Sequence, residues 1–327
     1  MKKHHKIKLA LATATTSLLG VTANVHAEHS PDIGDWDVDA AILYYTETDR
    51  VSAVEPVISA TKQLDTDETL SLKLVLDSLT GASANGAVQA NTPQTFTTPS
   101  GNSSYTTPAG ETPLDDTFLD TRVALSASWD MPLSRRDRLI LGGNISTEYD
   151  YTSIGASSVY THDLVGRNTT LSAGLAVASD TIEPEGNIPT PFGVMQPAGQ
   201  AQPRGSSSET KTTFDILLGM TQIINKNSLI QFNYSYSQAD GYLTDPFKVI
   251  SIVDTNGAPV VLPGTTDSSK VVYENRPDSR TKHSIFTQYK HFLTGDVFDI
   301  SYRYMFDDWE INSHTVDFRY RWKTSDT

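Results

Sequence analysis

The feature that most constrains this chain is a two-residue alternation of apolar and polar side chains in many segments after residue 28. Leucines at positions 70, 72, 74 and 76 share one face of such a segment, while Lys73 and Asp77 share the other. Side chains point to opposite sides along a β-strand, so each segment has one apolar and one polar face. The pattern predicts long β-strands, and few stretches offer a helical stripe.

The spacing of these segments predicts a transmembrane barrel. A soluble β-sandwich would also alternate, but these segments reach ten or more residues, which suits a tilted spanning strand. Short polar connections alternate with longer ones, and three long loops near 79–117, 182–210 and 242–278 all fall at one end, as in outer-membrane barrels. We expect an all-β antiparallel transmembrane β-barrel of about twelve strands, near 36–47, 51–62, 69–78, 118–130, 138–151, 155–164, 168–181, 211–224, 228–241, 279–292, 296–307 and 312–322.

Composition excludes several other classes of protein. The chain has no cysteine, so disulfides and thiolate metal sites are absent. Its net charge of −14 argues against nucleic-acid binding. No run of 18 apolar residues exists, which excludes a helical membrane protein. A secreted β-rich protein remains the alternative that composition allows.

The first segment predicts export. Four lysines precede a short apolar run from Leu9 to Val21, and Val25-His26-Ala27 supplies small residues at a cleavage site. The run is too short to span a bilayer. We therefore expect residues 1–27 to be a signal peptide cleaved after Ala27, and residues 28–327 to form an outer-membrane barrel.

The alternation also predicts which side chains face the barrel lumen and which anchor it in lipid. A mixed-charge lumen could select solutes, or its charges could pair into networks that fill and rigidify the interior, and we favour pairing for any single residue. Lumen-lining candidates are Asp37, Asp39, Lys73, Asp77, Asp120, Arg122, Glu148, Asp150, Asp215, Asp299, Arg303, Asp317, Arg319 and Arg321. Candidates for aromatic girdles at the membrane interfaces are Trp36, Trp129, Tyr149, Tyr151 and Trp322.

Some segments fit the pattern less well. Pro56 lies inside the second predicted strand and must sit at or beside a bulge, because proline donates no ladder hydrogen bond. Segments 155–164 and 279–292 alternate poorly.

No cofactor or metal site is expected. Acidic clusters at 65–68 and 307–310 lack the spacing of a calcium loop, and the second, with Trp309, could contact lipopolysaccharide sugars. A lipid-facing serine hydrolase would need a serine and a histidine within hydrogen-bond reach. The adjacent pairs His283-Ser284 and Ser313-His314 point to opposite faces, so we expect no enzyme.

Several stretches resemble an uncharacterised proteobacterial family. The pieces that carry the resemblance include VYENRPDSRTKH at 272–283, SYRYMFDDWEINSHTVDFRYRW at 301–322, DRVSAVEPVI at 49–58 and GYLTDPFKVIS at 241–251. Together they look like the domain of unknown function DUF3570. The resemblance implies a Gram-negative outer-membrane barrel with no assigned activity or functional residues. It also implies, by gene neighbourhood alone, a link to periplasmic flavin or redox proteins.

The end of the chain and the function leave alternatives open. Twelve strands could close a barrel, but family members usually run longer and barrels usually end in an aromatic residue. We therefore expect a chain truncated from about sixteen strands. The favoured function is a non-enzymatic pore or transporter for small polar solutes, in contact with outer-membrane lipid and lipopolysaccharide. The alternatives are a plugged barrel that holds a periplasmic flavin or redox partner, and a hydrolase.

Overall fold

The structure is a computed structural model that describes residues 33–48, 50–98, 102–260 and 271–323. The predicted signal peptide lies outside these residues. The described chain folds entirely into strands and their connections. The strands are β1 (Trp36–Thr46), β2 (Val51–Asp65), β3 (Glu68–Ala84), β4 (Gln94–Thr97), β5 (Ser104–Thr107), β6 (Leu114–Pro132), β7 (Asp137–Thr147), β8 (Tyr151–Asp163), β9 (Thr169–Ile182), β10 (Glu209–Asn225), β11 (Ser228–Gly241), β12 (Val249–Ser251), β13 (Val271–Tyr273), β14 (Ser279–Leu293), β15 (Asp296–Asp307) and β16 (Asn312–Arg321).

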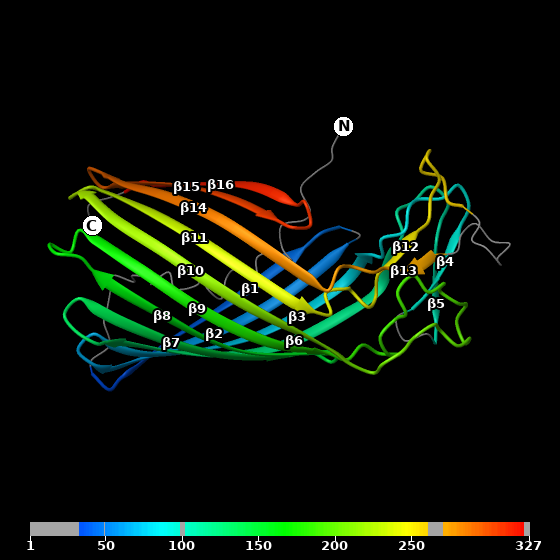
Figure 1. The fold of residues 1–327 in the computed structure, drawn as a ribbon, viewed down its shortest axis with the longest axis horizontal. Coiled ribbons are helices and arrows are strands. Elements are labelled where there is room, and N and C mark those ends of the chain that lie inside the picture. Colours follow the sequence, from blue (N-terminus) through cyan, green and yellow to red (C-terminus); the bar gives the residue numbers. More distant parts are fainter. Residues whose placement is uncertain (1–32, 49, 99–101, 261–270, 324–327) are drawn as a thin grey trace.

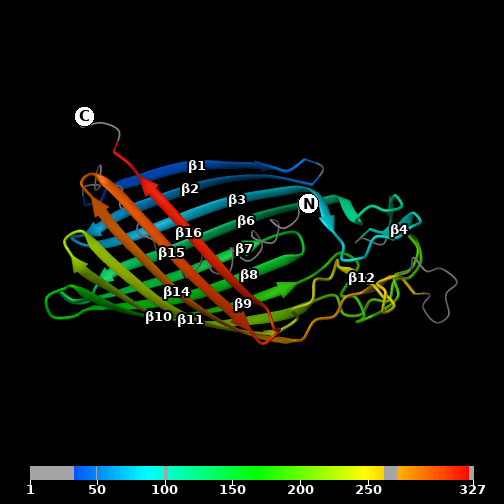
Figure 2. The same cartoon turned by 90° about the horizontal axis from the view of Figure 1, so that it is seen from above.

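Twelve long strands form one antiparallel sheet, in the order β1-β2-β3-β6-β7-β8-β9-β10-β11-β14-β15-β16. Each strand of this sheet pairs with the next long strand of the chain, and the sheet curls into a barrel wall (Figures 1 and 2). The predicted all-β barrel fold is confirmed, and all twelve expected strands are present.

The pairing register keeps the apolar faces in line from strand to strand. Leu74 pairs with Leu125, which pairs with Ile145, which pairs with Ile154. These residues are partly to largely exposed, and the last two are 48% and 60% exposed. Because apolar side chains of this size are usually buried, a continuous exposed band on one face indicates an apolar surrounding.

Two features differ from the expected strands, in addition to register shifts at Gln63–Asp65, Gly81–Ser83 and Ile223–Asn225. Pro56 pairs with Ile42 on the β1 side, but neither Glu55 nor Pro56 has a partner on β3, so the ladder is interrupted where proline lacks its N–H. The strand expected over 138–151 ends at Thr147, and residues 148–150 form the turn into β8.

The connections divide the barrel into two ends. Short turns join strands at one end, which we call the turn end. At the other, the loop end, the three predicted long loops pack together as a small cap that projects beyond the barrel (Figure 1). The cap contains the hairpins β4–β5 and β12–β13. The described parts of these loops therefore have strand pairing of their own, which the sequence patterns did not reveal.

The two edge strands, β1 and β16, are not paired with each other in the described residues. Every residue of β1 is exposed, as are most residues of β16. Since β1 runs from the turn end to the loop end and β16 runs back, their directions are opposite, as neighbours in an antiparallel wall require.

Candidate functional site: the charged inner wall and the loop-end cap

The outward face carries the predicted aromatic residues at the turn end. Trp36, Trp129 and Trp322 are 46%, 41% and 68% exposed. Trp36 and Trp129 lie on the same face as the apolar band, and Trp322 directly follows β16. The Trp129 indole donates a hydrogen bond of 2.8 Å to Glu68. This combination of an apolar ring and a polar partner suits a membrane–water interface.

The two tyrosines predicted for the girdle differ in placement, since Tyr149 is 62% exposed at the loop end whereas Tyr151 contacts the inner wall. Tyr149 sits in the β7–β8 turn, and Tyr151 begins β8 with its hydroxyl accepting a hydrogen bond of 2.9 Å from Lys211 of the inner wall. The prediction for Tyr151 is wrong because the turn at 148–150 resets the alternation that we had extended through it.

The charged candidates share the face opposite the apolar band. Register pairs place Lys73 beside Ser126, Asp77 beside Arg122 and Asp299 beside Arg319. By the same alternation, the inner face also carries Asp37, Asp39, Asp120, Asp215, Arg303, Asp317 and Arg321, and Glu148 and Asp150 lie in the turn at its loop end.

Ion pairs on this inner face join groups on neighbouring strands or on the same strand. Arg122 lies 3.1 Å from Asp77, Lys211 lies 2.8 Å from Asp180, and Arg319 lies 3.0 Å from Asp317. Further pairs are Arg138–Asp130, Arg280–Asp307 and Lys290–Asp299. None of the salt bridges among the described residues spans the lumen. Of the predicted lumen residues, Asp77, Arg122, Asp299, Asp317 and Arg319 have such partners, and these pairs run along the wall.

A group of three carboxyls remains outside these pairs at the loop end. Asp120, Glu148 and Asp150 interact, with Arg122 close by. Burial and the neighbouring Asp120 raise the pKa of Glu148 to about 7, although Arg122 opposes this shift. Burial and Asp120 also raise the pKa of Asp150. One Asp120 oxygen and the Arg122 Nε are buried without a hydrogen-bond partner among the described residues.

Two of the sequence motifs meet at the loop end of β14 and β15. Arg280 of the ENRPDSR motif binds Asp307 of the DDW motif, whose side chain is fully buried. The Arg280 guanidinium lies 4.5 Å from the centre of the Trp309 ring, and the Trp309 indole donates to the Ser279 carbonyl at 2.9 Å. Trp309 therefore stabilises this corner, which sequence spacing could not reveal because the two motifs are 27 residues apart.

The first half of the ENRPDSR motif forms a compact turn. Arg276 pairs with Glu274 at 2.7 Å, and Glu274 accepts a hydrogen bond of 2.9 Å from the Asp245 amide. Arg276 therefore pairs within its own loop, whereas Arg280 pairs with Asp307 at the end of β15.

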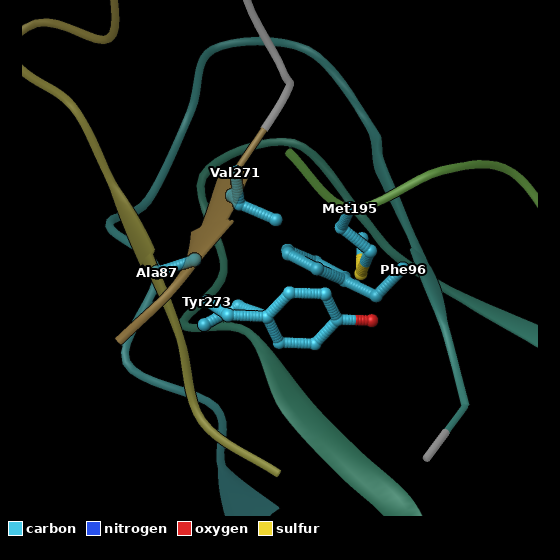
Figure 3. Close-up of a cluster of buried hydrophobic side chains, with 6 residues drawn as sticks. Ala87, Phe96, Met195, Val271 and Tyr273 are labelled. Atoms are coloured by element: carbon cyan, nitrogen blue, oxygen red, sulfur yellow. The ribbon is translucent and has the colours of Figure 1, made fainter. Parts of the chain in front are cut away.

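The cap has its own apolar core. Phe96, Met195, Val271 and Tyr273 come from all three long loops and point toward one another (Figure 3). Phe96 stacks on Tyr105 with ring centres 5.3 Å apart. Backbone hydrogen bonds of 2.8 to 3.0 Å also tie the loops together, from Val249 to Asn85 and from Met195 to Val271. Three loops far apart in sequence thus form one unit.

The outward face contains one serine–histidine contact. Ser228 and His291 are register partners, with the Ser228 Oγ 2.7 Å from the His291 Nδ1. The third polar group, the Tyr289 hydroxyl, lies 3.4 Å from that same nitrogen and 3.4 Å from the Ser228 Oγ. No carboxylate or amide partner of the ring is found among the described residues, and Ser228 is only 6% exposed. The pair meets the distance criterion for a hydrolase, but it lacks an orienting group on the far nitrogen.

Within the described ranges, no three acidic or histidine side chains are arranged to hold a metal ion. The same residues contain no helix long and apolar enough to cross a membrane. Of the two acidic turns considered for calcium, the one at 307–310 has Asp307 occupied by Arg280 and by the amides of Trp309 and Ile311.

The family assignment follows from a comparison with family models. The model described as "Protein of unknown function (DUF3570)" matches residues 8–327. The chain belongs to the DUF3570 family. A search of curated proteins gave no match to this DUF3570 protein.

Among solved structures, this DUF3570 barrel is similar to several outer-membrane proteins. One is the ferric enterobactin receptor PfeA of Pseudomonas aeruginosa, with 8% identity, a TM-score of 0.43, and coverage of 91% of this chain and 43% of the receptor. Another is the ferric-catecholate import receptor Fiu of E. coli, with 11% identity, a TM-score of 0.41, and coverage of 91% and 54%. The NanC porin has 11% identity, a TM-score of 0.36, and coverage of 88% and 98%. This chain thus spans about half the length of the two receptors.

Proposed function

We propose that this DUF3570 protein resides in the outer membrane and acts as a pore or transporter for small polar solutes. The observation that carries the proposal is the direction of the ion pairs. Salt bridges along a wall stabilise it and leave its inner surface polar, whereas a plugged lumen would need bridges or packing across it.

The outward face supports the location. Its apolar band, with three tryptophans at the turn end, is what a spanning barrel presents to lipid and to the interface. The short turns then face the periplasm, and the cap faces the exterior.

Conductance of the refolded protein in planar bilayers tests the pore. The chain has no cysteine, so single thiols can be introduced cleanly. Ser284 and Ile285 are neighbours on β14. Ser284 lies on the inner face of the wall, and Ile285 lies on the lipid-facing side. With S284C, we expect a water-soluble methanethiosulfonate reagent to reduce the current, because the thiol faces water in the lumen. I285C is the matched control and should not respond. Protein that is folded and heat-modifiable but passes no current would refute the pore.

The second candidate function is a closed barrel that holds a periplasmic flavin or redox partner. The observation that favours it is the ordered cap, which could occlude the loop end. A cap that closes the barrel should give silent bilayers that begin to conduct when residues 85–113 are shortened. A conducting full-length protein would argue against this candidate.

A further inference from the structure

The charges of the inner wall are unevenly distributed between its two halves. Acids predominate on β1 to β8 and in the β7–β8 turn, where Lys73, Arg122 and Arg138 are the inner cations of the described residues. Most inner cations instead lie on β10 to β16, namely Lys211, Arg280, Lys282, Lys290, Arg303, Arg319 and Arg321.

Salt bridges do not cancel this imbalance. Among the described residues, Asp120, Glu148 and Asp150 have no salt bridge, and the first half also carries Asp37 and Asp39 without one. On the other half, Lys282, Arg303 and Arg321 have no salt bridge to any residue that the structure describes. Two charges go against this division, since Lys73 lies on the acidic half and Asp215 lies on the basic half. Asp215 is close enough to Lys282 for the two charges to attract each other. The uncompensated charge is thus acidic on one half and basic on the other.

The strand order places these groups across the lumen from each other. β6 carries Asp120, β14 carries Lys282, and five strands of the sheet separate β6 from β14. The curl of the sheet puts β6, β7 and β8 on one side of the barrel and β14 and β15 on the opposite side (Figure 1). Asp120 and Glu148 lie toward the loop end, as does Lys282, the register partner of Asp307.

We propose that these two walls create a transverse electric field near the loop end, and that the preferred solutes are small zwitterions. The inference rests on the proposed pore. A solute with separated positive and negative charges can place its cation at the Asp120–Glu148 side and its anion at the Lys282–Arg303 side. An uncharged solute of the same size gains nothing from the field, and a singly charged solute is attracted to one wall only.

Flux into proteoliposomes tests the inference. Glycylglycine is the zwitterion, N-acetylglycinamide is an uncharged compound of similar size, and N-acetylglycine is the anion. We expect glycylglycine to enter roughly threefold faster than N-acetylglycinamide. Removing the acidic wall with D120N/E148Q, or the basic wall with K282Q/R303Q, should each bring that ratio close to one.

A control separates the field from net charge. D240N removes an acid from the outward face of β11, so it changes the net charge without altering either inner wall. It should leave the flux ratio unchanged. If D120N/E148Q alters the entry of N-acetylglycine but not the ratio of the other two solutes, net charge is the cause and the inference fails.

Failure of the inference can be told apart from failure of the pore. Equal, rapid entry of glycylglycine and N-acetylglycinamide in the unmodified protein would overturn the zwitterion preference while the pore stands. No entry of any of the three compounds, with the protein folded, would overturn the pore and the inference with it.

Discussion

Arg280 and Asp307 show how one pair of residues can fix a corner of the barrel. The Asp307 side chain is fully buried and the Arg280 side chain is 19% exposed, so little water screens their attraction. Asp307 also accepts the amides of Trp309 and Ile311 at 3.0 and 2.9 Å. A carboxylate with this many donors holds the β15–β16 turn and the start of β14 together.

We expect D307N to lower the free energy of unfolding by about 2 to 4 kcal/mol, because Arg280 then loses its charge partner in a dry corner. Denaturant unfolding followed by tryptophan fluorescence measures the change. D308N is the matched control, since the Asp308 carboxylate accepts the Thr281 amide in an exposed contact and has no salt bridge within the described residues. Equal losses for the two variants would contradict a special role for Asp307.

The raised pKa of Glu148 predicts that the stability of the protein depends on pH. Its pKa is raised to about 7 from a usual value near 4.5, so the folded state binds this proton more tightly than the unfolded state. The contribution of Glu148 to the free energy of unfolding should therefore rise as the pH is lowered from 8 to 6. Measuring the free energy of unfolding at pH 8 and at pH 6 tests this expectation. The difference between the two values should be smaller in E148Q than in the unmodified protein. If the stability of E148Q has the same pH dependence as that of the unmodified protein, groups other than Glu148 cause that dependence.

At the scale of elements, the cap is a folding unit built on the barrel. The core of the cap comes from three loops that are separated in the sequence by whole hairpins of the barrel. Backbone hydrogen bonds and apolar packing join these loops to one another. The barrel strands, by contrast, are held by long hydrogen-bonded ladders between neighbouring strands of the sheet. Loss of the cap core should thus loosen the loops without dissolving the barrel.

We expect F96A to increase hydrogen exchange in residues 85–98 and 242–260, because removing a buried aromatic ring costs about 3 to 5 kcal/mol of local packing. Phe96 is 1% exposed, whereas Phe192 in the same cap is 56% exposed, so F192A is the matched control. Heat-modifiability of the barrel should stay unchanged in both. Barrel unfolding in F96A would show that the cap and the barrel fold as one unit.

At the scale of the whole molecule, the edges β1 and β16 decide whether the wall is complete. In hydrocarbon, an unpaired backbone N–H or C=O costs several kcal/mol, so a sheet edge cannot face lipid. We expect the amides of β1 and β16 in bilayers to be as protected from hydrogen exchange as those of β2 and β15. Rapid exchange confined to the two edges would contradict a closed wall.

The sequence by itself determined the strands, their order and their two faces. Because side chains alternate strictly along a strand, Lys73, Asp77, Arg122 and Arg319 could be assigned to the inner face from spacing alone. The same rule failed at Tyr151, where a three-residue turn shifts the alternation and local pattern does not reveal the change. Only the tertiary structure decided the contacts between distant segments: the joining of Arg280 to Asp307 and Trp309, the assembly of three polar loops around Phe96, and the placement of acidic and basic walls across the lumen. Such contacts depend on the curvature of the sheet and on packing between remote residues, neither of which has a periodic signature in the chain.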